Sequence, residues 1–423
     1  MPLNRRSFLS MTAIAASLAA VSACGAQNDS TSSASGSSTD SPPERDANAD
    51  LVIWADQKKA DSIRDTATKW GEEQGLTVAV QTVANDLQSN FITANQAGNG
   101  PDIVMGAHDW IGNMVQNGSI DPVSLTDTAK ANYFDVALAA VTYDGQTYAA
   151  PYAVETVALF ANKSLTSVSA PTTIEELVDA GKAAGVEAIL SLPVGEEGDA
   201  YHMQPIYTAA GGYLFGKKDD GSYNPDDLGV GGAGSLVAAD KIGALGADGV
   251  LKKSITGDNA IALFTDGKAP YLVSGPWALA DVKGAGIDYQ ISQIPGFADI
   301  EGSTARPFVG VNCFFVASKG KNKAFAVDFV ADAAKDSTFA EAMFTSNELP
   351  PAQKDLAEKL KTEHADMVTL ADLAANADPM PAIPAMSAVW QPLGQAEANI
   401  VGGADPASTM TSAGEEIKKK IGG

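Results

Sequence analysis

The sequence of 423 residues has few of the side chains from which metal and disulfide sites are built. Two cysteines and three histidines make both a disulfide framework and a zinc site hard to assemble. No uninterrupted apolar run approaches the roughly 20 residues that cross a bilayer as a helix. A nucleophile elbow and a phosphate-binding glycine loop are also missing. These absences argue against common hydrolase and nucleotide-binding classes.

Basic residues are scarce as well. The chain carries 28 Lys and Arg against 52 Asp and Glu, a formal net charge of −24. Such a chain repels phosphate backbones, so we expect no nucleic-acid partner. The composition, 45% hydrophobic and 19% charged, is that of a globular protein, and the length suits two or three domains.

The first 23 residues have the features of an export signal. Arg5 and Arg6 stand directly before a short apolar run, residues 8–21, as in secretory signal peptides. The paired arginines followed by Ser-Phe-Leu resemble the twin-arginine signal. The run ends Val-Ser-Ala-Cys, which resembles the bacterial lipobox with Cys24 as the lipidated residue; a chance cysteine after an ordinary cleavage site is the alternative. We therefore expect residues 1–23 to be removed and Cys24 to anchor the chain to the extracellular face of the cell membrane.

Residues 24–49 are dominated by Ser, Thr, Asp and Asn. Such a segment buries too little apolar surface to offset its ordering entropy, so it is predicted to be a disordered tether. With Cys24 acylated, Cys313 has no disulfide partner. Its apolar surroundings predict a buried structural thiol.

Alternating strand and helix patterns follow the tether and indicate an α/β fold. Strands are predicted at 51–54, 77–83 and 101–105, with helices at 59–73 and 86–96 between them, which favours a parallel sheet with right-handed crossovers. Ligands bind beyond the carboxyl ends of such strands, which places residues 55–56 and 106–110 at the rim of a cleft. Later segments are predicted as strands at 188–192 and 270–273 and helices at 206–215, 260–264 and 321–343.

Seven short segments share one resemblance. They are Leu-Val-Ile-Trp at 51–54, Gly-Pro-Asp-Ile at 100–103 with Ala-His-Asp at 107–109, Ala-Ala-Pro-Tyr-Ala-Val-Glu at 149–155, Ala-Ala-Gly-Gly-Tyr at 209–213, Ser-Gly-Pro-Trp at 274–277, Pro-Phe-Val-Gly-Val at 307–311 and the Met-Pro to Val-Trp run at 380–390. In this order they are similar to the maltose/maltodextrin-binding proteins of bacterial ABC importers, over essentially the whole chain from Leu51 onward.

The resemblance implies a two-lobed periplasmic-binding-protein type II fold. Each lobe is a sheet flanked by helices, and the sugar lies in the cleft between the lobes, which close over it. The expected lobes and hinges are lobe 1 at 50–153 plus 314–359, lobe 2 at 158–308 plus 366–423, and hinges near 154–157, 309–313 and 360–365. A monomer is expected, with an oligosaccharide ligand, ABC permease subunits as partners, and no cofactor or metal.

A sugar ring needs flat aromatic platforms for its C–H face and carboxylates or amides for its hydroxyls. The resemblance implies Tyr201, Trp277 and Trp390 as platforms, with core packing as the alternative for each. Trp54 and Trp70 are instead expected in the core.

The polar residues implied by the resemblance are Asp109 and Glu155, with Asp56, Lys58 and Lys59 in a loop for which a solvated turn is the alternative. Met380 completes the expected set, and a structural hydrogen bond is expected of His108.

Departures from the family affect the pocket more than the scaffold. Gly106 stands where the family has a Trp platform, and Trp110 replaces an Arg. One interpretation is that the platform has moved from 106 to 110.

Maltose or maltodextrin is therefore the leading ligand class, and trehalose or a different oligosaccharide stays open. A glycosidase would need Asp109 and Glu155 as its acid and base, but the family binds without cleaving, so we expect no enzyme. A lipoprotein adhesin or a receptor for a non-sugar solute is the third class.

Overall fold

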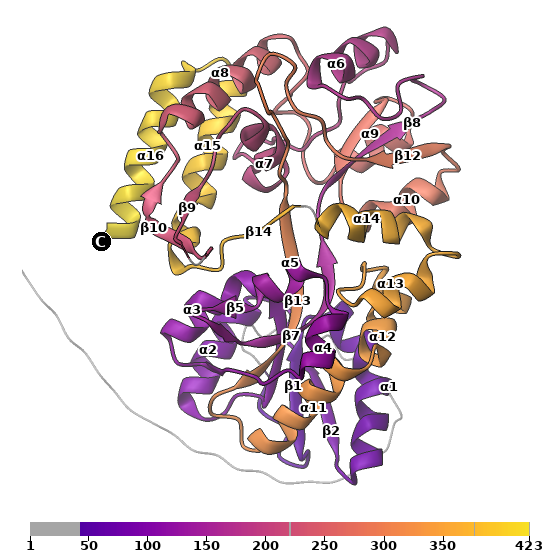
Figure 1. The fold of residues 1–423 in the computed structure, drawn as a ribbon, viewed down its shortest axis with the longest axis vertical. Coiled ribbons are helices and arrows are strands. Elements are labelled where there is room, and N and C mark those ends of the chain that lie inside the picture. The colour runs from indigo at the N-terminus through magenta and orange to yellow at the C-terminus, as the bar shows by residue number, and fades with distance from the viewer. Residues whose placement is uncertain (1–42, 220, 376, 423) are drawn as a thin grey trace, which may run out of the picture. The chain divides into compact units, whose positions relative to one another are not determined.

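The computed structural model describes residues 43–219, 221–375 and 377–422 of the chain (Figure 1). The predicted signal peptide, Cys24 and residues 25–42 of the predicted tether lie outside these ranges. Within them, every helix is too short or too polar to cross a membrane.

The largest sheet contains the first predicted strands. Its order is β14-β13-β3-β1-β2, and β4 and β7 also pair with β13. Its strands are β1 Leu51–Ala55, β2 Val78–Thr82, β3 Ile103–Ala107, β4 Ile120–Asp121, β7 Ala149–Glu155, β13 Phe308–Ala317 and β14 Asp378–Pro379. β1 is parallel to β2 and to β3, as predicted, but β13 is antiparallel to β3. The sheet is therefore mixed, because β13 joins it from a distant part of the chain.

Helix α1, Gln57–Gln74, shows why the first predicted helix forms. The Asp56 side chain accepts a hydrogen bond from the Lys59 backbone N–H at 3.0 Å and so caps the N-terminus. Gly75 ends the helix in the left-handed conformation, with φ 72°. Its buried residues are Ala60, Ile63, Ala67, Trp70 and Gly71. Trp54 and Trp70 are both in the core, as expected.

Further helices and short strands surround this sheet. They are α2 Leu87–Ala97, α3 Ile111–Gln116, α4 Asp127–Asn132, α5 Asp135–Ala140, β5 Thr142–Tyr143, β6 Gln146–Thr147, α11 Lys323–Lys335, α12 Thr338–Asn347 and α13 Lys354–Leu360. The helix predicted at 321–343 is thus two helices, because Asp336 ends α11 in extended backbone.

A second, antiparallel sheet has the order β11-β8-β12. Its strands are β8 Ala158–Asn162, β11 Tyr271–Ser274 and β12 Tyr289–Ser292. Because side chains alternate along a strand, Leu159 and Ala161 join one hydrophobic core while Ala158 and Phe160 join the other. The surrounding elements are α6 Ile174–Ala183, α7 Ala200–Ala209, β9 Phe215–Lys217, β10 Tyr223–Leu228, α8 Ala233–Ala247, α9 Ala260–Thr265, α10 Leu279–Gly284, α14 Ala365–Ala375, α15 Trp390–Val401 and α16 Pro406–Gly422.

Strand β13 connects the two cores. Phe308 at its start belongs to the second core, whereas Val309, Val311 and Cys313 belong to the first. β13 pairs with β7 along its length, and Figure 1 shows the two strands side by side. Cys313 is buried, as predicted. The expected lobe and hinge limits stay a prediction, since α14 packs against both β7 and β12.

The N-terminal residues of the described chain are held against the first sheet. The Arg45 guanidinium forms an ion pair with Asp102 at 2.6 Å, and both side chains are almost fully buried. The backbone N–H groups of Val52 and Asn322 donate to the same carboxylate, each at 2.8 Å. Arg45, near the end of the predicted tether of residues 24–49, is therefore fixed to the folded part of the chain, which differs from the prediction. A buried guanidinium requires an ionic partner, and Asp102 supplies it.

Two segments differ from their predicted secondary structure. Residues 188–192 were expected to form a strand, but only Ser191 pairs with β11. Pro193 follows directly, and a proline cannot donate to a sheet ladder. The helix predicted at 206–215 lies at 200–209 instead, because Asp199 caps its start and the chain turns at Gly211, with φ 90°.

Glu397 is a buried acid within the second core. Its side chain is fully buried on α15, and neither carboxylate oxygen has a hydrogen-bond partner among the described residues. Burial, with the nearby charge of Asp199, raises the pKa of Glu397 well above its usual value. The protonated form is therefore favoured, and the unsatisfied polar atoms cost stability.

We predict that Glu397→Met increases the free energy of unfolding by about 1–3 kcal/mol, because methionine removes the unsatisfied oxygens at similar volume. Because the folded-state pKa is raised, Glu397 destabilises the fold least below its usual pKa of 4.5. The gain in unfolding free energy from methionine should therefore grow as the pH rises above that value. Urea denaturation at several pH values measures this. Glu415→Met, at an exposed position of α16, is the matched control and should change little. A less stable Glu397→Met variant would contradict the prediction.

Candidate functional site

The ends of three strands of the first sheet carry the predicted polar residues. Asp56 follows β1, residues 108–110 follow β3 as a short 3-10 helix, and Glu155 ends β7. β1 and β3 are parallel, so their carboxyl ends lie at one edge of the sheet, as the ligand-site rule for such sheets requires.

Asp56, Lys59 and Glu155 form one electrostatic group. Lys59 Nζ lies 2.5 Å from Asp56 Oδ2. Burial raises the pKa of Glu155, while the Lys59 charge and a hydrogen bond from Asn312 oppose the increase. The carboxyl of Glu155 is thus partly buried and near a cation, which suits hydrogen bonding to a polar ligand.

Asp109 has an unused acceptor atom. Its Oδ1 is buried and has no hydrogen-bond partner among the described residues. Burial raises the pKa of Asp109 to about 6. A buried carboxylate oxygen without a partner is costly unless a ligand or water completes its hydrogen bonds.

Trp110 lies directly over Gly106. A Cβ atom added at Gly106 would be 2.2 Å from Cζ3 and 2.4 Å from Cε3 of the Trp110 indole. The ring therefore occupies the space that any side chain at 106 would need. This geometry fits the interpretation that Trp110 takes the place of the platform missing at 106.

Aromatic rings from distant segments form a continuous row. The Tyr201 ring, in the first turn of α7, lies 6.4 Å from Trp277 and 6.0 Å from Phe308, and Phe308 lies 5.6 Å from Trp390. The side chain of Trp277 is 41% exposed, and Tyr201 and Trp390 are partly buried. Phe308 was not among the predicted site residues, although it lies in a segment that carries the resemblance.

The aromatic row and the carboxylates lie near each other. Burial, followed by the charges of Glu155, Asp199 and Asp109, raises the pKa of Tyr201 far above its usual value. The carboxylates of Glu155 and Asp109, at the strand ends, are therefore near enough to Tyr201 to shift its pKa. The Asp199 carboxylate, which caps the helix of Tyr201, acts in the same direction. The structure brings together rings and acids, the chemistry that sugar recognition needs.

His108 joins three segments through both ring nitrogens. Its Nδ1 accepts a hydrogen bond from the Val311 N–H, and its Nε2 donates to the Met380 carbonyl, each at 3.0 Å. The side chain is fully buried, which lowers its pKa to about 4. The expected structural role of His108 is confirmed by these bonds, which require a neutral ring.

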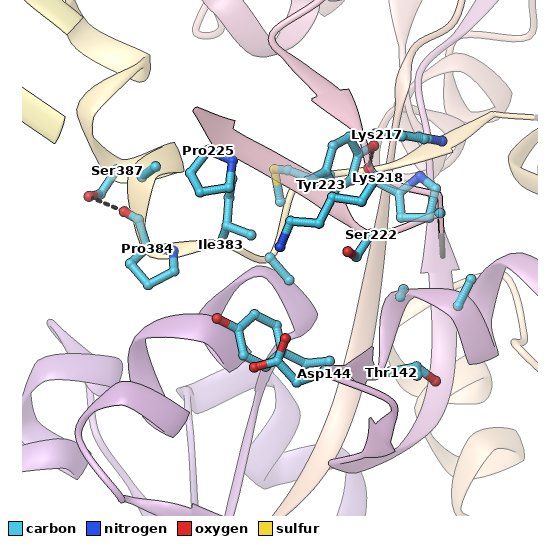
Figure 2. A pocket seen from close by; sticks show the side chains of 18 of the residues that line it. Thr142, Asp144, Lys217, Lys218, Ser222, Tyr223, Pro225, Ile383, Pro384 and Ser387 are labelled. Carbon is cyan, nitrogen blue, oxygen red and sulfur yellow. Dashed lines mark hydrogen bonds between the residues drawn. The ribbon is translucent and has the colours of Figure 1, made fainter. Parts of the chain in front are cut away.

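Two predicted residues stand apart from the rings and carboxylates. Lys58 is exposed on α1, and its carbonyl accepts a bond from Ser62. Met380 offers its backbone to His108 and lines a separate cavity of about 620 Å³. Figure 2 shows this cavity between the β9–β10 side chains, such as Lys218, and the Thr142 and Asp144 side chains. Site roles for Lys58 and Met380 stay predictions.

Within the ranges that the structure describes, no three or more His, Cys, Asp or Glu side chains are grouped so as to hold a metal ion. The polar atoms gathered here are carboxylates, an ammonium and an amide beside aromatic rings. These groups suit hydrogen bonding to, and stacking on, a neutral, hydroxyl-bearing solute.

The chain belongs to the family of bacterial extracellular solute-binding proteins, whose model matches residues 65–375. It is 30% identical to the galactooligosaccharide-binding protein of Bacillus subtilis strain 168, over 98% of this chain and 96% of that protein. It is 28% identical to the maltodextrin-binding protein MdxE of the same strain, over 90% and 91%.

A crystal structure of a cyclo/maltodextrin-binding protein complexed with maltotetraose matches the fold. Its TM-score is 0.77 at 27% identity, covering 89% of this chain and 99% of that one. The predicted two-lobed α/β fold of the periplasmic-binding type is confirmed by this match and by the family.

We predict that His108→Gln flattens the pH dependence of stability. The unfolded chain takes up a proton at its usual His pKa of 6.5, whereas folded His108 resists it down to about 4. Wild-type stability should therefore fall by about 3 kcal/mol from this group as the pH drops through that window. Glutamine keeps one donor and one acceptor without titrating, and Asp109 is common to both proteins. Denaturation curves from pH 7 to pH 4 measure the difference, and parallel curves would contradict it.

Proposed function

We propose that the protein is the substrate-binding lipoprotein of an ABC sugar importer and captures maltodextrin-type oligosaccharides. The observation that carries this proposal is the row of rings from Trp277 through Tyr201 to Trp390, beside the unpartnered oxygen of Asp109. Several linked platforms suit an oligosaccharide better than a single sugar, because each ring covers the apolar face of one unit.

The relatives support this class of ligand. Two of those described above are named for maltodextrins, and two from Streptococcus pneumoniae are named maltooligosaccharide ABC transporter solute-binding lipoproteins, at 26% and 24% identity. By the same reasoning, the lobes close over the sugar and the closed monomer delivers it to the membrane permease without cleaving it. The protein is exported through a twin-arginine signal, and a lipid on Cys24 then holds it on the extracellular face of the membrane.

A galactooligosaccharide is the second candidate ligand. The relative with that name matches 98% of the chain. Trp110, stacked over Gly106, also gives the site an aromatic face where the maltose receptors carry an arginine. A different platform position changes which sugar faces and linkages fit the site. For this reason trehalose is included as a third sugar to test.

Calorimetric titration of the purified protein with maltotetraose, a galactotriose and trehalose tests the proposal. We expect maltotetraose to bind with one-to-one stoichiometry and to be recovered intact. Tighter galactotriose binding would favour the second candidate, and released monosaccharide would indicate an enzyme. If none of the three glycans binds, the proposal that the protein is a sugar receptor is overturned.

We predict that Trp277→Ala weakens sugar binding by about 1–3 kcal/mol, because it removes exposed stacking area. Val237→Ala, at a residue of similar exposure on α8, is the matched control and should bind as the wild type does. Wild-type affinity in the Trp277 variant would show that this indole does not contact the ligand.

We predict that affinity rises with pH through the titration of Asp109. Below its pKa of about 6 the carboxyl gains a proton and loses its charge-assisted bonds to ligand hydroxyls. Binding should weaken by up to about tenfold from pH 7 to pH 5, since a group with this pKa is roughly nine-tenths protonated at pH 5.

Asp109→Asn should bind more weakly at pH 7 and show a shallower pH profile, measured by calorimetry at each pH. Glu155, whose pKa is also raised, remains in both proteins and accounts for any residual slope. An unchanged slope in the variant would assign the pH dependence to a group other than Asp109.

A further inference from the structure

A second cavity lies next to Phe308 of the aromatic row. Its volume is about 490 Å³, and α7, β9, β10 and the residues around β14 line it. Phe308 contributes to its wall and also stacks on Tyr201 and contacts Trp390. The cavity therefore shares one ring with the candidate site, but Trp277, Asp109 and Glu155 are not among its lining residues.

Gln204 lines this cavity and has an unsatisfied amide oxygen. Its side chain is 6% exposed, and its Oε1 is buried without a hydrogen-bond partner among the described residues. It lies on α7 one turn after Tyr201 and one turn before Thr208, which lines the same cavity. A buried acceptor without a partner is costly, and a ligand hydroxyl would satisfy it.

The charged groups at the cavity balance one another. Arg306 donates from Nε and Nη2 to Asp378 at 2.6 and 2.9 Å, and Lys217 donates to the same carboxylate at 3.3 Å. Asp227 accepts from the Tyr213 hydroxyl at 3.0 Å. Two cations thus face two carboxylates, so the cavity has no excess charge to attract an ion.

An exposed ring completes the cavity wall. Tyr213 is 44% exposed, although it is a large aromatic residue, and its hydroxyl is held by Asp227. A fixed, exposed ring beside a buried amide and oriented carboxylates provides a C–H platform and hydroxyl partners together.

We propose that this cavity is a second binding site, which takes a single neutral sugar ring. Its volume suits one small ligand, and its balanced charges favour a polyol over an anion. The cavity adjoins the oligosaccharide site at Phe308 but is otherwise lined by different residues, so the inference goes beyond the proposed function.

The test is a saturation-transfer NMR titration with D-glucose and D-galactose, run with maltotetraose present in excess. We expect one monosaccharide to bind the wild type, and Gln204→Leu to weaken that binding tenfold or more. Gln353→Leu is the matched control, because Gln353 is also buried with an unpartnered Oε1 but does not line the cavity. Tyr213→Ala changes an exposed residue, so it tests the same site with little risk to folding.

Binding that both cavity variants weaken and Gln353→Leu leaves unchanged would support the second site. Absence of monosaccharide binding to the wild type, or equal binding in the cavity variants, would overturn it. Displacement of the sugar by inorganic phosphate would overturn its assignment to a neutral ligand. If maltotetraose itself fails to bind, the proposed function fails, but the comparison of Gln204→Leu with Gln353→Leu still decides this inference.

Discussion

Strand β13 is the element on which the rest of the structure depends, because its residues belong to both hydrophobic cores. Phe308 packs with the second core and the aromatic row, and a few residues later the strand pairs with β3 and β7 in the first sheet. His108 binds the same strand at Val311 and also the chain at Met380. The start of β13 and the two hydrogen bonds of His108 therefore link the two cores close to Asp109 and Glu155.

The site draws on both cores in different ways. The first sheet supplies acids at its strand ends, where their burial raises the pKa of Asp109 and of Glu155. The rings come from elements of both cores: Trp277 precedes α10, whose Leu279 and Val282 belong to the first core, and Trp390 begins α15, whose Leu393 and Ile400 belong to the second. The combination of acids and rings is therefore assembled from segments that lie far apart in the chain.

Local patterns predicted the elements whose signals are strongest. β1, α1 and β3 formed where apolar runs and Gly75 indicated, although α1, capped by Asp56, begins two residues before its predicted start. The antiparallel entry of β13 could not be predicted, because pairing between distant strands leaves no local pattern. The single-residue pairing at Ser191 and the earlier start of α7 depended on Pro193 and Asp199, whose effects compete with hydrophobic periodicity. For the site, the resemblance named the rings, but the contribution of Phe308 appeared only in space.

Trp110 shows how a matched scaffold can carry a different pocket. The indole can lie against the strand only because Gly106 has no side chain: even a methyl group there would come within 2.2 Å of the ring. The two positions are therefore coupled, and a platform can occupy one of them but not both. Sequence similarity that follows the strands and hinges does not report such an exchange. The family and the fold are defined by the chain as a whole, whereas this coupling is local to Gly106 and Trp110.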